Sequence, residues 1–224
     1  MKCQQITIII CICLNFVLIN QAIASKVMVT NSTGSQFTVS WVTEKNCIGK
    51  VMLYDHNMSF IGTFTDDRDP YFIGDTHHVS ITGLSCNSDY VFSIVSGDRK
   101  DDNNGQFYVA STGNNMLPTG SFQPAGQVFS KDTKTVATNA IVYIVVSNGE
   151  SQTSPLSCIV DQNGYWFTEL VNARTEDNQH LFSVSTSSML NIRIEGGKMG
   201  SFLLESEAKD NNGGKSLYEP VILR

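Results

Sequence analysis

The stretch Gln36-Phe-Thr-Val-Ser-Trp-Val-Thr43 decides the fold class, because apolar and small polar residues alternate along most of it. Phe37, Val39 and Trp41 fall on one face of such a segment, and the intervening threonine and serine fall on the other. A period of two predicts a β-strand with one buried face.

Further alternating segments surround this stretch within residues 25–113, separated by clusters of Gly, Asn, Asp and Ser that are typical of turns. We expect a hairpin tip at residues 99–105. Val79 and Ile81 share one face of their segment, and so do Tyr90, Phe92 and Ile94. The pattern predicts seven strands, at residues 26–30, 36–43, 48–55, 60–65, 76–84, 89–96 and 106–112.

Two motifs in this region resemble the fibronectin type III family. Phe37-Thr-Val-Ser-Trp41 is similar to its second strand with the core tryptophan. Leu84-Ser-Cys-Asn-Ser-Asp-Tyr90 resembles its Leu-x-Pro-x-Thr-x-Tyr signature, the tyrosine corner, with Cys86 for proline and Ser88 for threonine. Thr76-His-His-Val79, followed by this corner, is similar to the fibronectin-like N-terminal domain of purple acid phosphatases. The resemblance covers residues 25–113 and implies a sandwich, but little about activity.

A second β-sandwich is predicted at residues 125–224, after a linker at 114–124 that holds two prolines. Its opening pattern, Gly-x-Val, Ala-x-Val-x-Ile and then Asp161-x-x-Gly-Tyr-Trp166, resembles the carboxypeptidase regulatory-like (transthyretin-like) sandwich. We expect strands at 125–129, 139–146, 157–160, 165–167, 181–185, 190–195, 200–204 and 218–223. The fold class is therefore all-β, with two tandem immunoglobulin-like β-sandwiches.

Residues 1–24 have the pattern of a cleaved signal peptide. Lys2 gives a basic start, the run from Ile6 to Ile19 is mostly apolar, and Ala22 and Ala24 suit a signal peptidase. The run is shorter than the ~20 residues that a membrane-spanning helix needs. We therefore expect a secreted or cell-envelope protein with no membrane span after signal cleavage.

Signal cleavage leaves three cysteines, Cys47, Cys86 and Cys158, so at least one cannot pair within the chain. The family resemblance implies that Cys47, between the second and third strands, and Cys86, in the tyrosine corner, lie at opposite ends of the first sandwich. Their Cα atoms would then be too far apart for a disulfide. We interpret all three as small buried hydrophobic residues.

Composition excludes some partners. The chain has a net charge of −6, which becomes −7 without Lys2, and it has no basic run, which argues against nucleic acid and anionic membranes. Charged residues are only 16% of the chain, against roughly 25% in average domains. The 24 Ser, 18 Thr and 18 Asn residues replace them and fit exposed strand faces and turns.

No residue pattern predicts catalytic, cofactor-binding or metal-binding residues. His77 and His78 are adjacent, so on a strand they point to opposite faces and cannot readily chelate one metal; we expect them at the sheet surface or an interface. The chain has enough Ser, His and Asp residues for a Ser/His/Asp triad, so their number does not exclude one. However, the sequence contains no Gly-x-Ser-x-Gly motif, which forms the nucleophile elbow of many hydrolases. The metal-binding motif of purple acid phosphatases is missing too, so we expect no enzyme.

Weaker candidates have simpler explanations. Three acidic loops, at residues 66–69, 98–104 and 210–214, could supply calcium ligands, but none has the Asp-x-Asp-x-Asp-Gly spacing, which favours solvated turns. Tyr165 and Trp166 could form an aromatic platform, although alternation predicts one core and one surface ring. Two segments, at residues 31–33 and 57–59, match the glycosylation acceptor pattern.

These observations favour an exported, non-catalytic binding or adhesion protein whose partner is an extracellular protein or a carbohydrate. Loops at the sandwich ends and exposed sheet edges would make the contact. Two alternatives stay open: an accessory protein to a secreted hydrolase, and a structural subunit of an extracellular matrix or appendage.

Overall fold

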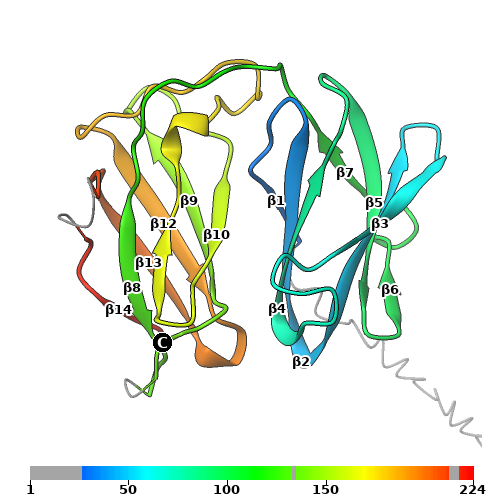
Figure 1. The fold of residues 1–224 in the computed structure, drawn as a ribbon, viewed down its shortest axis with the longest axis horizontal. Helices are drawn as coiled ribbons and strands as arrows, with labels where there is room; N and C mark the ends of the chain where they lie inside the picture. The colour runs from blue at the N-terminus through cyan, green and yellow to red at the C-terminus, as the bar shows by residue number, and fades with distance from the viewer. Residues whose placement is uncertain (1–26, 133–134, 212–216) are drawn as a thin grey trace, which may run out of the picture.

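The computed structural model describes residues 27–132, 135–211 and 217–224, which form two β-sandwiches side by side (Figure 1). The first contains β1 to β7 and the second contains β8 to β14. The prediction of an all-β fold with two immunoglobulin-like sandwiches is confirmed. The predicted signal peptide at residues 1–24 lies outside the described residues.

One sheet of the first sandwich has β2 (Gln36–Asp55) at its centre. The first half of β2 pairs with β1 (Met28–Thr30) on one side and with β4 (Ile73–Thr82) on the other, all antiparallel. The deciding stretch lies in this half, and Phe37, Val39 and Trp41 are all buried as predicted.

The second half of β2 belongs to the opposite sheet. There it pairs with β3 (Phe60–Thr65) and β5 (Asp89–Ser96). β5 in turn pairs with β6 (Arg99–Asp101) and β7 (Tyr108–Ser111). β3 pairs with β2 alone among the named strands, so it forms an edge of this sheet.

Two predictions about the first sandwich are wrong in detail. The expected break between residues 43 and 48 is a continuous strand, and only the register with β4 shifts between Val42 and Cys47. The exposed polar residues 44–46 lie at this irregularity, which is why they resemble a loop in sequence. The expected hairpin tip at 99–105 is also displaced, because β6 begins at Arg99 after a turn at Gly97.

The tyrosine corner is formed as predicted. The hydroxyl of Tyr90 accepts a hydrogen bond of 2.9 Å from the backbone N–H of Ser85. Tyr90, Phe92 and Ile94 pack into the core with Val79 and Ile81.

The second sandwich also has two sheets. The first is β10 (Leu156–Ile159), β9 (Ile141–Ser147), β12 (Met189–Glu195) and β13 (Ser201–Glu207), in that spatial order. Antiparallel pairing joins all four strands. The core against the other sheet includes Val142, Ile144, Leu190, Ile192 and Trp166.

The other sheet has three short strands, β11 (Tyr165–Phe167), β8 (Ala125–Phe129) and β14 (Val221–Ile222), with β14 parallel to β8. Trp166 is buried and Tyr165 is exposed, which confirms the predicted split of this aromatic pair. The expected strand at 181–185 is wrong, because only an isolated bridge joins Leu181 to Arg174.

The described residues also contain two single-turn 3-10 helices, η1 (Leu170–Asn172) and η2 (Gly197–Met199). No helix in the described part of the chain is long and apolar enough to cross a bilayer.

Candidate functional site

The two sandwiches meet through a largely polar contact between the β1–β2–β4 sheet and the β9–β10 side of the second sandwich. Ser40 on β2 and Tyr143 on β9 share a hydrogen bond of 2.9 Å between their hydroxyls. The hydroxyl of Thr76 on β4 donates to the carbonyl of Asn139 (2.8 Å). Because buried polar groups need partners, such contacts fix how the sandwiches lie against each other.

Asn31, just after β1, bonds to β10 as a neighbouring strand would. Its Oδ1 accepts from the backbone N–H of Ser157 (2.9 Å), and its Nδ2 donates to the Ser157 carbonyl (3.0 Å). The backbone N–H of Asn31 donates to the carbonyl of Pro155 (3.0 Å). The side-chain amide is fully engaged in this fold, so of the two glycosylation patterns only the one at exposed Asn57 leaves its amide free.

Asp67, His78 and Ser157 have the relative placement of a catalytic triad. Asp67 Oδ2 lies 2.7 Å from Nδ1 of His78, and Nε2 of His78 lies 2.9 Å from Oγ of Ser157. Both His78 and Ser157 are about 5% exposed. Burial raises the pKa of Asp67, but hydrogen bonds from His78 and Ser80 lower it more, so the net pKa lies below the usual value.

The hydroxyl of Ser157 nevertheless has no free lone pair. When Asp67 accepts from Nδ1–H of His78, Nε2 must accept the Ser157 hydroxyl proton. The two lone pairs of Ser157 Oγ then accept from the Thr30 hydroxyl (2.6 Å) and from Nδ2 of Asn31 (3.2 Å), which also lies 3.2 Å from Oγ1 of Thr38. A serine nucleophile needs a lone pair directed at its substrate. The arrangement therefore joins the sandwiches rather than activating the serine.

The acidic loop at residues 66–69 is one of the calcium candidates. Its buried carboxylate, Asp66, forms an ion pair with Arg68 of the same loop. Asp66 accepts two hydrogen bonds from Arg68, from Nε (2.7 Å) and Nη2 (2.8 Å). Arg68 also donates to the Asn139 carbonyl across the junction (3.3 Å). The expectation of a solvated turn is wrong for Asp66, which is buried because the guanidinium fork neutralises it.

The adjacent histidines point to opposite faces, as predicted, but only His78 lies at the interface. His77 lies in the core of the first sandwich, with its ring stacked on Trp41 at 4.8 Å. The expectation of a surface or interface position is therefore wrong for His77. Burial lowers the pKa of His77 to about 4, and the attraction of nearby Asp66 only partly opposes this.

The three cysteines of the described residues, Cys47, Cys86 and Cys158, are all free, in line with the expectation that Cys47 and Cys86 form no disulfide. Cys47 and Cys158 are partly buried, but Cys86 is exposed, so its interpretation as a buried hydrophobic residue is wrong. Burial raises the pKa of Cys158 to about 12, which keeps its thiol unreactive. In the described ranges, no group of three or more His, Cys, Asp and Glu side chains is placed to hold a metal ion.

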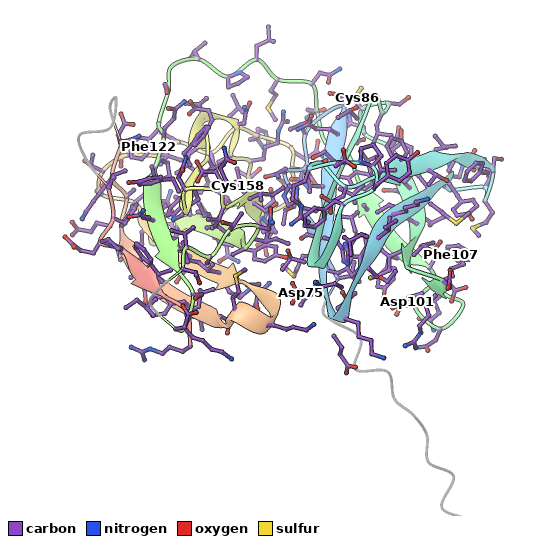
Figure 2. The ribbon with its side chains drawn as sticks, turned by 60° about the horizontal axis from the view of Figure 1, so that its bottom comes forward. Asp75, Cys86, Asp101, Phe107, Phe122 and Cys158 are labelled. Atoms are coloured by element: carbon purple, nitrogen blue, oxygen red, sulfur yellow. The ribbon has the colours of Figure 1, made fainter. Side chains whose placement is uncertain are left out.

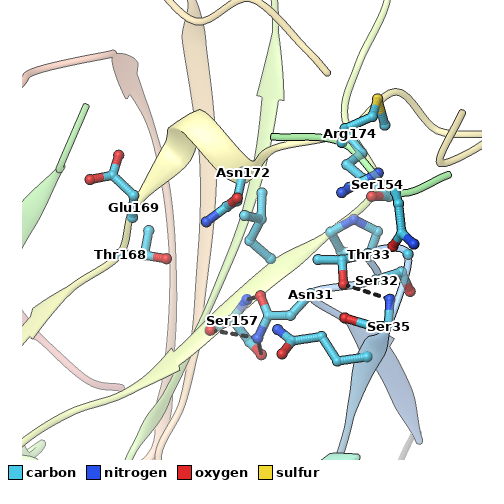
Figure 3. A pocket seen from close by; sticks show the side chains of 16 residues that line it. Asn31, Ser32, Thr33, Ser35, Ser154, Ser157, Thr168, Glu169, Asn172 and Arg174 are labelled. Carbon is cyan, nitrogen blue, oxygen red and sulfur yellow. Dashed lines mark hydrogen bonds between the residues drawn. The ribbon is translucent and has the colours of Figure 1, made fainter. Parts of the chain in front are cut away.

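A pocket of about 410 Å³ opens at the rim of the junction (Figure 3). Its walls come from the loop after β1, the linker after β7, and the segment around η1. Hydroxyl and amide side chains dominate the lining, which contains no aromatic ring. These polar side chains include Ser32, Thr33, Asn115, Ser154, Thr168 and Asn172.

Arg174 forms part of the pocket wall and is only 3% exposed. Its Nη1 donates to the linker carbonyl of Asn114 (2.6 Å), but its Nε has no hydrogen-bond partner among the described residues. No described carboxylate forms an ion pair with it. Burial lowers the pKa of Arg174, yet a guanidinium stays charged in proteins. The pocket wall therefore holds a buried cation that forms no ion pair with a described residue.

The acidic side chain of the pocket is Glu169, whose carboxylate is occupied. It accepts from the backbone N–H of Phe122 (2.8 Å), the hydroxyl of Ser121 (2.8 Å) and Nε2 of Gln123 (2.9 Å). Burial raises the pKa of Glu169, but these hydrogen bonds outweigh it and the net pKa lies below its usual value. Figure 3 places Glu169 and Arg174 on opposite sides of the pocket.

A second candidate surface lies on the outer face of the β3–β2–β5–β7 sheet. Cross-strand pairing places Phe60, Tyr54, Val91 and Val109 in one transverse row, which we call the apolar strip. The ring of Phe107 packs on Tyr54 at 5.5 Å, as does the ring of Phe60. Figure 2 shows Phe107 on the side of the first sandwich that faces away from the second.

The sequence did not point to the residues that build the junction and its pocket. Asn31 and Ser157 are 126 positions apart, and no local pattern pairs them. Arg174 lies in an irregular segment with no motif around it. The adjacent histidines were the one feature of the sequence that indicated the junction. Alternation along the strand places one of them on the face of the sheet that points away from the core.

No protein-family model matches the chain, and no curated protein matches it. Among solved structures, a two-domain fibronectin type III segment of chicken tenascin is similar at 10% identity, with a TM-score of 0.31, covering 83% of this chain and 99% of that one. The central fibronectin-III array of RIM-binding protein is similar at 12% identity, with a TM-score of 0.27, covering 85% of this chain and 62% of that one. Scores this low carry no argument, so the fibronectin type III-like fold of the first sandwich rests on its strand order and tyrosine corner.

Proposed function

We propose that this chain is an exported, non-catalytic binding or adhesion protein that contacts an extracellular protein through the apolar strip. The exposure of the strip carries the proposal: Phe60 is 57% and Val109 is 63% exposed, at opposite ends of one row. Contiguous apolar surface on a soluble protein marks an interaction site. The free edge of β3 lies beside the strip and offers backbone groups to a partner.

Export remains a prediction from residues 1–24, and so does the location outside the cell or in its envelope. The similarity of the second sandwich to carboxypeptidase regulatory-like domains, and that of the first to purple acid phosphatases, also remain predictions from sequence. The proposal does not depend on either similarity, because it uses only the exposed face of the first sandwich.

The test is crosslinking of the purified mature chain to intact cells and extracellular material of its source, followed by mass spectrometry. We expect one specific partner, and we expect the double variant Phe60→Ser/Val109→Ser to reduce its capture at least tenfold. Leu203→Ser is the matched control, because Leu203 is 75% exposed on the second sandwich and should retain capture.

Equal capture by the strip variant and the control would contradict the proposal. Concentration-dependent polymerisation that the strip variant abolishes would instead favour a structural subunit.

A further inference from the structure

We propose that the pocket at the junction binds a sugar acid, a ligand that carries one carboxylate beside several hydroxyl groups, with Arg174 holding the carboxylate. The inference goes beyond the proposed function, because the pocket and the apolar strip lie on different parts of the molecule and share no residue.

The first step is the unmatched charge of Arg174. A guanidinium carries five N–H donors, and the structure uses one nitrogen, Nη1, for the Asn114 carbonyl. A buried cation without a partner is costly, so a site that retains one is suited to an anion. The planar fork of a guanidinium matches a carboxylate through two parallel hydrogen bonds.

The second step is the polarity of the remaining wall. The side chains of Ser32, Ser154, Thr168 and Asn172 make no hydrogen bond to the described residues, so their donors and acceptors are available. Hydroxyl and amide groups both donate and accept, which matches the hydroxyl groups of a sugar. Because no aromatic ring lines the pocket, a sugar ring cannot stack on a side chain there. The main attraction would then be between the carboxylate of the ligand and Arg174.

The third step is size and charge. A volume of about 410 Å³ falls at the small end of the ~300–1,000 Å³ found for ligand pockets, which suits one sugar ring. The ionised carboxylate of Glu169 across the pocket repels a second negative group, so a singly charged acid fits better than a polyanion.

The fourth step is preorganisation, because the wall is already in place. Gly34 packs so closely on the linker that an added Cβ would lie 2.2 Å from Oδ1 of Asn115. Nδ2 of Asn114 donates to the Gln179 carbonyl (3.1 Å), which ties the linker to the second sandwich. A site that needs little ordering on binding keeps more of its interaction energy.

The test is isothermal titration of the mature chain with D-galacturonate and D-glucuronate, and with the neutral sugars D-galactose and D-glucose. We expect at least one acid to bind at least tenfold more tightly than its neutral counterpart. Arg174→Gln should weaken that binding at least tenfold, and Arg174→Lys several-fold, because an ammonium lacks the planar fork. Arg99→Gln is the control, since Arg99 is exposed and outside the pocket.

If thermal unfolding shows that the Arg174 variants do not fold, Ser154→Ala/Asn172→Ala becomes the decisive variant, with acid binding weakened several-fold. Tighter binding of an oligogalacturonate than of the monomer would assign the acid to a polysaccharide, and equal binding would assign it to a free sugar acid. Equal affinity for acids and neutral sugars, or full binding by the pocket variants, would overturn the proposal. So would Arg174-dependent binding of a peptide with a free C-terminal carboxylate in the absence of acid binding.

Discussion

Single residues decide whether the polar groups in this molecule act in chemistry or in structure. Asp67, His78 and Ser157 have triad geometry, but the neighbours of Ser157 occupy the lone pairs that catalysis would use. His77, one position before His78, is buried on a tryptophan ring and has no hydrogen bond to Nδ1 among the described residues. The same residue type therefore has two roles, which the alternation of the strand determines.

The first prediction concerns the pH dependence of stability, which His77 should dominate between pH 6.5 and 4. The pKa of His77 is about 4 in the folded chain, against 6.5 for an unperturbed histidine, so the unfolded chain binds more protons in this window. Stability therefore falls as the pH drops from 6.5 to 4, by about 3 kcal/mol at ~1.36 kcal/mol per pKa unit. Denaturant unfolding across this range measures the slope.

His77→Gln should flatten this slope, because glutamine does not titrate. His56→Gln is the matched control, since it removes a histidine at an exposed position. The same slope in His77→Gln and in the parent chain would show that His77 is not the group responsible.

At the scale of elements, local alternation of apolar and polar residues predicts the strands. It does not predict where a strand passes from one sheet to the other or where the two sandwiches meet. β5 and β11 agree with the predicted residue ranges because their patterns are strictly local. β2 continues through residues 44–46 despite their polar sequence, since its two halves pair in different sheets. The pocket was not predictable for a similar reason: Arg174 and its linker partner Asn114 are 60 positions apart.

The second prediction is that Tyr90→Phe destabilises the first sandwich by about 1 kcal/mol, the usual net value of one hydrogen bond. The change removes only the hydroxyl that accepts from Ser85 and retains the buried ring. Tyr165→Phe is the control, because Tyr165 is exposed and should change stability by less than about 0.5 kcal/mol. Urea unfolding measures both variants; equal effects would mean that the corner contributes no stability.

At the scale of the whole molecule, two sandwiches with separate cores are joined by a polar junction rather than an apolar one. Hydrogen bonds specify geometry more strictly than apolar contact does, so the junction fixes one arrangement of the two sandwiches. The pocket needs this arrangement, because its walls come from both sandwiches and the linker.

The third prediction follows from the position of Asn31. Asn31→Ala leaves the backbone N–H and carbonyl of Ser157 without their partner, which should cost about 2 kcal/mol or more. By calorimetry we expect one unfolding transition for the parent chain and two for Asn31→Ala, as the sandwiches then unfold independently. Asn57→Ala, at an exposed turn, should retain one transition. A single unshifted transition in Asn31→Ala would mean that the junction does not couple the sandwiches.

A binding protein and a serine hydrolase differ in whether Ser157 can react. Intact-mass spectrometry after incubation with a fluorophosphonate, which modifies activated serines, tests this directly. We predict no adduct on the folded chain, because the lone pairs of Ser157 are occupied by Thr30 and Asn31. A single adduct that maps to Ser157 and disappears in Ser157→Ala would contradict the account.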